Sequence, residues 1–230
     1  RRFFGDHYWY REGVDYLLQR QQPVSGAWVG ASQIAEAQGE IATSFALLFL
    51  SKGRWPVVAA KYEYGTDRQW DHNPKGLHQL VRTTEKRWDQ KLTWQTVNSR
   101  LASVNDLLQS PVLVLSGTDS LNLSAKQKEV LQDYVTQGGF LFAWANQSED
   151  CEGAGFDEDF RKLMAGLFPD SPLTALDANH PIWFADRAVK PSPDRPLLGI
   201  QACCRTSIVY CPANLACAWQ AAHPVFQREL

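Results

Sequence analysis

Two continuous apolar runs constrain the fold of this chain more than any other feature. Residues 111–117 read Pro-Val-Leu-Val-Leu-Ser-Gly, and residues 139–145 read Gly-Phe-Leu-Phe-Ala-Trp-Ala. Apolar runs without polar alternation are typical of strands that are buried on both faces of a parallel sheet. Between them, Ser124 and Gln127 form a capping box at the start of an amphipathic helix that ends before Gly138. This order of strand, helix and strand predicts two parallel neighbours joined by a right-handed crossover.

The rest of the chain from residue 57 onward continues this alternation. β-branched and aromatic residues predict further strands, and capped amphipathic stretches predict further helices. The predicted strands cover residues 57–64, 93–97, 199–203 and 206–210, and the predicted helices cover residues 71–88, 103–110 and 156–167. The pattern predicts an α/β fold, a three-layer sandwich with a mostly parallel sheet, and the last two strands are expected to pair antiparallel at one edge.

The first 55 residues carry a different pattern, that of an α-helical hairpin. Tyr10, Val14 and Leu17 share one face of a helix that Pro23 stops, and a second helix is predicted over residues 40–52. The apolar faces exceed what two helices can bury against each other, so the hairpin needs neighbours. We therefore predict two domains, residues 1–55 and 56–230, and the absence of an initiator Met leads us to expect a further segment upstream.

Composition argues against several classes of protein. The net charge is −2 without a basic face, which argues against nucleic-acid binding, and no apolar run approaches the length of a membrane span. The five cysteines are an odd number, and the last four lack the paired C-x2-C spacing of a zinc site. No glycine-rich phosphate loop is present. We therefore expect no metal and no cofactor.

Polar residues follow the two apolar runs, where an open α/β sheet binds its ligands. An aromatic ring beside carboxylates and an amide suits a carbohydrate, although a protein ligand or ordinary polar loops explain the same residues. The candidate ligand-binding residues are Thr118, Asp119, Trp144, Asn146, Glu149 and Asp150.

A spaced pattern in the hairpin, Gly13-x2-Tyr16-Leu17-x3-Gln21-x4-Gly26-x-Trp28, resembles the QW repeat of the squalene-cyclase and prenyltransferase α/α-toroid proteins. The resemblance implies a structural brace in which the Gln21 side chain caps a helix end and the Trp28 ring stacks against it. It also implies that upstream toroid repeats of the parent chain pack against this one. The acidic DxDD motif of the cyclases has no counterpart here.

From about residue 57 the chain resembles DUF4159, a bacterial family of unknown function. The motifs that carry the resemblance are residues 111–117, 123–124, 134–142, 156–161, 167–169, 180–181 and 217–219. The resemblance implies a flavodoxin-like sheet of the ThuA and class I glutamine-amidotransferase superfold, and an extracytoplasmic location. Family members often carry Gly-His-Gly after the first buried strand, whereas this chain has Gly117-Thr118-Asp119, so no histidine role carries over.

The superfold raises the question of a cysteine nucleophile. Amidotransferases use a Gly-x-Cys-x-Gly elbow directly after a strand, and Cys151-Glu152-Gly153 keeps only half of it. His180 could act as a base, although a lone histidine before a proline is typical of a turn. Three hypotheses follow: a non-catalytic binding module, which the missing catalytic signature favours, an amidotransferase-like hydrolase using Cys151 and His180, or part of a terpenoid-cyclase-like parent.

Overall fold

The computed structural model describes residues 7–30, 38–52, 56–65, 68–146, 154–202 and 205–220. The chain divides into two compact units, Arg1–Pro56 and Val57–Leu230. This division lies one residue from the predicted boundary. The two units are described separately.

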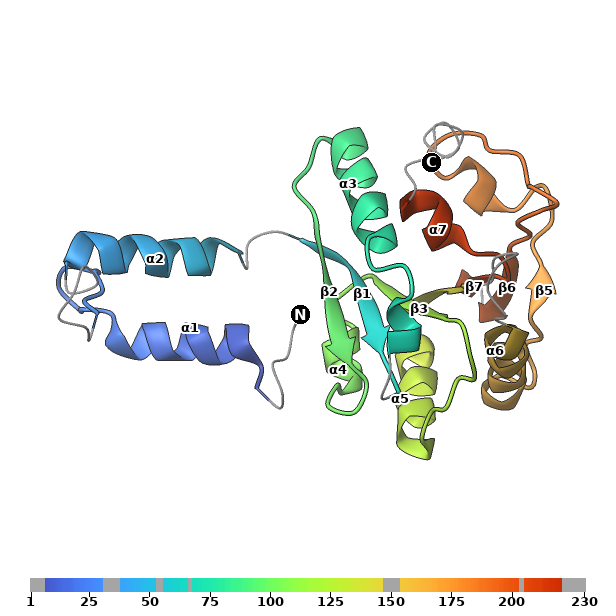
Figure 1. Ribbon diagram of the computed structural model, residues 1–230, viewed down its shortest axis with the longest axis horizontal. Helices are drawn as coiled ribbons and strands as arrows, with labels where there is room; N and C mark the ends of the chain where they lie inside the picture. Colours follow the sequence, from blue (N-terminus) through green and yellow to red (C-terminus); the bar gives the residue numbers. More distant parts are fainter. Residues whose placement is uncertain are drawn as a thin grey trace. The chain divides into compact units, whose positions relative to one another are not determined.

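The first unit is a hairpin of two helices, α1 (Trp9–Arg20) and α2 (Gly39–Lys52), which run antiparallel (Figure 1). Aromatic rings hold them together: the Phe49 ring lies 5.6 Å from Trp9 and is stacked at 5.2 Å on Tyr10. Gly13 permits this approach, because a Cβ atom there would collide with the Phe49 ring. These ring contacts therefore join the start of α1 to the end of α2.

The second unit is built on a seven-stranded sheet in the order β2-β1-β3-β4-β7-β6-β5. The five strands from β2 to β7 in this order are parallel, and β6 and β5 are antiparallel to their neighbours. The strands are β1 (Val57–Glu63), β2 (Thr93–Asn98), β3 (Val112–Gly117), β4 (Phe140–Ala145), β5 (Thr174–Ala175), β6 (Leu198–Ala202) and β7 (Arg205–Cys211). The parallel part has the flavodoxin-like order, with the switch point between β1 and β3.

Helices cover both faces of this sheet, which confirms the predicted three-layer α/β sandwich (Figure 1). On one face, α3 and α7 bury Val114 and Trp144 under Leu77 and Trp219. On the other face, α6 stacks Phe160 on Tyr210 of β7 at 4.3 Å. The helices are α3 (Gly76–Trp88), α4 (Val104–Leu107), α5 (Ala125–Thr136), α6 (Ala154–Leu167) and α7 (Leu215–Gln220).

The two apolar runs pair as predicted. Strands β3 and β4 are parallel neighbours in continuous register from Val112 opposite Phe140 to Gly117 opposite Ala145. The predicted capping box is present, with the Ser124 hydroxyl accepting from the Gln127 amide at the start of α5. The late strands form the expected antiparallel hairpin, and the two-residue β5, which was not predicted, lies outside it.

The helix predicted over residues 71–88 begins later than expected. A short 3-10 turn, η2 (Arg68–Asp71), precedes α3, which starts at Gly76. Asp71, which was expected to open the helix, instead accepts a hydrogen bond from the Lys61 ammonium group of β1 at 2.6 Å. This ion pair fixes η2 to the sheet. No helix among the described residues is long and apolar enough to cross a membrane.

Candidate functional site

The carboxyl ends of β3 and β4 adjoin, so the polar residues that follow them share one edge of the sheet. The backbone N–H of Asn146 donates to the Gly117 carbonyl at 2.8 Å, which ties the two strand ends together. Asp119 is exposed there, and its carboxylate accepts from the Thr118 hydroxyl at 3.4 Å. Glu149, Asp150 and Cys151 lie outside the described residues. The strand ends therefore bring the backbone of Asn146 beside Gly117, and a binding site made by Thr118, Asp119 and Asn146 stays a prediction.

Trp144 is not available to a ligand, and the prediction of an aromatic platform for a sugar is wrong for this residue. Its side chain is 0% exposed, and its ring makes an edge contact with Trp219 of α7 at 5.2 Å. The indole nitrogen donates to the Asn146 side-chain oxygen at 3.0 Å, and Asn146 is itself buried. The pleat turns both side chains towards the face that α7 covers, and α7 was not predicted.

His180 lies near the amino end of β7, whereas Asp119 and Asn146 follow the carboxyl ends of the parallel strands β3 and β4. Its Nε2 atom is 2.8 Å from the hydroxyl of Thr206, which stands at the amino end of β7. Its Nδ1 atom accepts from the Ile182 amide and caps the 3-10 turn η3 (Pro181–Phe184). Both ring nitrogens therefore have partners, one in β7 and one in the turn. A pairing of His180 with Cys151 stays a prediction, since Cys151 is not among the described residues.

The switch point between β1 and β3, where this fold type binds ligands, is filled by side chains. On one face, a Cβ atom at Gly117 would collide with the Tyr64 hydroxyl and the Phe156 ring. On the other face, the Ser116 hydroxyl donates to the carbonyl of Trp70 in η2, and the Trp70 side chain is buried. The described residues thus close this crevice themselves.

A buried ion pair holds η2 in that position. The Lys61 side chain is 2% exposed and Asp71 is 18% exposed. The Lys61 ammonium also lies 5.4 Å from the Trp70 ring centroid. Burial lowers the pKa of Lys61 from its usual value, and the hydrogen bond and charge of Asp71 oppose this shift. Lys61 therefore has a structural role, which is to hold η2 on the sheet. The sequence analysis missed it, although a lysine within an apolar strand indicates a buried ion pair.

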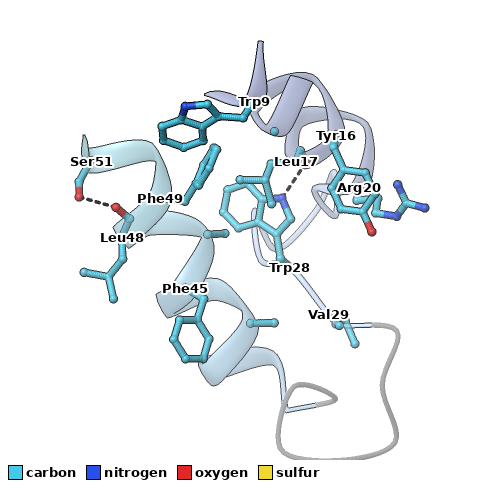
Figure 2. Close-up of a pocket in the computed structure, with 14 residues that line it drawn as sticks. Trp9, Tyr16, Leu17, Arg20, Trp28, Val29, Phe45, Leu48, Phe49 and Ser51 are labelled. Carbon is cyan, nitrogen blue, oxygen red and sulfur yellow. Dashed lines mark hydrogen bonds between the residues drawn. The ribbon is translucent and has the colours of Figure 1, made fainter. Parts of the chain in front are cut away.

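A hollow lies in the helical hairpin, in the first of the two units. A groove of about 1030 Å³ runs between α1 and α2, and mostly apolar side chains line it (Figure 2). Its walls stay open to solvent: Phe45 is 63% exposed, Leu48 is 61% exposed and Tyr16 is 52% exposed. Arg20 is the one formal charge among the described residues that line it, and its guanidinium lies over the Tyr16 ring at 3.9 Å.

The predicted brace of the hairpin occupies the loop after α1. The Gln21 side chain donates to the Gly26 carbonyl at 2.9 Å, and Gly26 has a positive φ of 69°. The buried Trp28 ring donates its Nε1 hydrogen to the Leu17 carbonyl at 2.7 Å (Figure 2). Trp28, and not Gln21, therefore caps the last turn of α1. A toroid made of such repeats stays a prediction.

No metal site is present among the residues that the structure places. No cluster of three or more His, Cys, Asp or Glu side chains there could hold an ion. Cys211 is buried and burial raises its pKa, so its thiol is held in the inert protonated form.

Comparison with known proteins gives a family and a distant structural relative. The family model described as "Domain of unknown function (DUF4159)" matches residues 58–229. No curated protein matches the chain. Among solved structures, it is similar to a ThuA-like protein from Bacteroides uniformis ATCC 8492, with 9% identity and a TM-score of 0.34. The match covers 64% of this chain and 61% of that one.

Proposed function

Because the chain belongs to the DUF4159 family, whose function is unknown, we propose from its own geometry that it is a non-catalytic protein-interaction module. Its binding site is the groove between α1 and α2, and its ligand is an apolar helical segment of a polypeptide. Further helical repeats of the parent chain and a separate protein are two sources of the same ligand chemistry.

The distribution of exposed apolar side chains carries this proposal. Among the described residues, seven of the eleven exposed large apolar side chains lie in the first unit, which has only 56 of the 230 residues. They are Tyr16, Leu18, Val24, Val29, Phe45, Leu47 and Leu48. Four of them, Tyr16, Val29, Phe45 and Leu48, line the groove together, and exposed apolar side chains that gather in one place mark an interaction site.

The spacing of the groove residues supports a helical ligand. The lining residues of α1 recur at intervals of three and four; they are Trp9, Gly13, Tyr16, Leu17 and Arg20. This spacing places one stripe along a helix, as in helices that pack into bundles. A partner with the same periodicity could set its side chains between these positions. An extended peptide needs backbone hydrogen bonds, which helices do not offer.

The other hypotheses have weaker support. A carbohydrate site at the strand ends would lack an aromatic ring, because Trp144 is buried. Thr118 and Asp119 remain there as polar residues at the surface. An amidotransferase-like hydrolase needs a base, and both nitrogens of His180 have partners. Terpenoid cyclisation by a parent protein rests only on the repeat pattern of the hairpin.

A peptide with the sequence of α2, residues 39–52, tests the proposal because it is itself an apolar helix. The dye-labelled full chain is kept at nanomolar concentration and titrated with the peptide, and binding is followed by thermophoresis. We expect saturable binding that Phe45→Glu in the chain weakens at least about tenfold, since a buried aromatic contact is replaced by a charge.

The matched control makes the same chemical change elsewhere. Phe184 in η3 is 56% exposed, close to the exposure of Phe45, so Phe184→Glu should leave peptide binding unchanged. Two results would overturn the proposal. One is the absence of saturable binding to the wild-type chain, and the other is equal weakening by the two substitutions.

A further inference from the structure

We infer that residues 177–189 form a strap whose turn η3 is held closed by neutral His180 and opens when this histidine is protonated. The turn η3 is the central element of the strap. The strap belongs to the second unit, so it is separate from the groove of the hairpin. It gives the chain a response to mild acid, since histidine changes charge between about pH 5 and 8.

The N-cap of η3 is of an unusual kind. His180 has an extended backbone there, and its Nδ1 atom accepts from the Ile182 backbone N–H at 3.2 Å. Pro181 follows at the first position of the turn, where its missing N–H costs no hydrogen bond. Caps are ordinarily Ser, Thr, Asn or Asp, none of which changes charge between about pH 5 and 8. A histidine does, so mild acid can remove this cap.

The hydrogen bonds of the His180 ring require its neutral form. Because Nδ1 accepts, the single proton of the neutral imidazole is on Nε2, and it is donated to the Thr206 hydroxyl oxygen of β7 at 2.8 Å. A second proton would go to Nδ1, where it meets the Ile182 N–H, and two donors cannot bond to each other. The closed turn therefore binds one proton fewer than the open turn, so acid shifts the equilibrium towards the open turn.

The charged groups around the ring do not compensate a proton on it. On β7, the Arg205 guanidinium donates to the backbone carbonyl that precedes β4. In the strap, the Asp177 carboxylate accepts from a backbone N–H of its own turn, and on β6 the residue opposite Thr206 is the uncharged Gln201. No carboxylate among the described residues bonds to the ring of His180, which is only partly buried and open to solvent protons.

Trp183 is the side chain that the open turn would expose. It is 8% exposed in the closed turn, and its indole nitrogen donates to the Asp177 carbonyl at 2.9 Å. Its own carbonyl accepts from the Val189 N–H at 2.8 Å, so Trp183 joins the two ends of the strap. Asp186 pairs with Arg87 of α3 at 2.8 Å without involving His180. Protonation therefore uncovers an indole while the strap stays attached to α3.

Hydrogen exchange of the full 230-residue chain at pH 7 and pH 5 tests this inference. Rates are expressed as protection factors, which remove the intrinsic pH dependence of amide exchange. We expect protection in residues 180–189 to fall at least about tenfold at pH 5, because the cap and the bonds of Trp183 are lost together. Protection in α5 should stay unchanged, which shows that the fold persists.

Two substitutions separate the cap from the charge. His180→Asn keeps a side-chain acceptor at the N-cap but does not titrate, so its protection should agree within about threefold at the two pH values. His78→Asn is the matched control, since His78 is exposed on α3, and it should show the same fall at pH 5 as the wild type. An equal fall in His180→Asn, or no fall in the wild type, would overturn the inference.

The ring nitrogens give a second readout that does not depend on substitution. Their ¹⁵N chemical shifts distinguish the two neutral tautomers, and we expect Nε2 of His180 to carry the proton at pH 7 and both nitrogens to carry one at pH 5. A proton on Nδ1 at pH 7 would contradict the cap. A His180→Asn chain without protection at both pH values would show that the ring itself, and not its charge, holds η3, which would also overturn the inference.

Discussion

The ion pair between Lys61 and Asp71 allows a prediction of how much stability a substitution can remove, with an upper limit set by the pKa of lysine. The Asp71→Asn substitution keeps the shape of the side chain but removes the charge that compensates a lysine only 2% exposed. Breaking a buried pair by removing one partner costs roughly 3–5 kcal/mol. The loss at Lys61 is limited, however, because a lysine can give up its proton instead of staying charged.

The ceiling follows from the usual pKa of lysine, 10.5 in the unfolded chain. Neutralising the amine costs about 1.4 kcal/mol for each pH unit below that value, which gives about 5 kcal/mol at pH 7 and about 2 kcal/mol at pH 9. Burial lowers the pKa of Lys61 in the folded state, so the unfolded state binds more protons between the two pKa values. Stability of Asp71→Asn therefore rises with pH in this window.

The reciprocal substitution should be milder. Lys61→Met removes the buried charge, keeps most of the volume, and leaves Asp71, which is 18% exposed and can reach water. We expect a loss within about 1.5 kcal/mol, and we expect the double variant Lys61→Met/Asp71→Asn to be more stable than Asp71→Asn alone.

Urea unfolding followed by tryptophan fluorescence at pH 7 and pH 9 measures these differences. The expected signature is a loss of about 3–5 kcal/mol for Asp71→Asn at pH 7 that shrinks to about 2 kcal/mol at pH 9. A loss below about 1 kcal/mol at pH 7, or a loss that grows with pH, would show that the lysine is not held as a buried cation.

Two further predictions concern positions with matched controls. Gly117→Ala should cost more than about 2 kcal/mol, because the new Cβ collides with Tyr64 and Phe156, whereas Gly166→Ala in α6 meets nothing within 4 Å and should gain up to about 1 kcal/mol. Urea midpoints compare the two, and similar effects would contradict the packing described at the end of β3. Trp28→Phe should speed amide exchange in α1 roughly tenfold, since the Leu17 carbonyl loses its indole donor at a cost of about 1–2 kcal/mol, whereas Trp88→Phe, at a side chain 55% exposed, should leave it unchanged. Equal exchange in the two variants would argue against the brace.

The sequence predicts most of the fold because a strand that is buried on both faces consists of consecutive apolar residues. The runs at 111–117 and 139–145 have no polar face, and the capping box at Ser124 marks the helix between them, so the central crossover follows from local rules. The sequence also predicts that the hairpin has more apolar surface than two helices can bury, and Phe45, which lines the groove, is exposed.

The candidate site was harder to predict because it depends on which faces are covered. Alternation places Trp144 on one face of β4, but the six-residue α7 is needed with α3 to bury it, and so short a helix has little periodicity to detect. The same holds for the four-residue η2, whose Trp70 fills the switch point. Long-range contacts such as Lys61 to Asp71 are decided by tertiary packing, not by sequence spacing.

The order of the strands has a consequence for biosynthesis. Strand β7 is the last to leave the ribosome, yet it lies inside the sheet between β4 and β6. Until it is made, β4 presents an unpaired edge, and α7 is not yet there to cover Trp144. A nascent chain that stalls before residue 205 therefore displays an open apolar sheet, which is the kind of surface that chaperones bind.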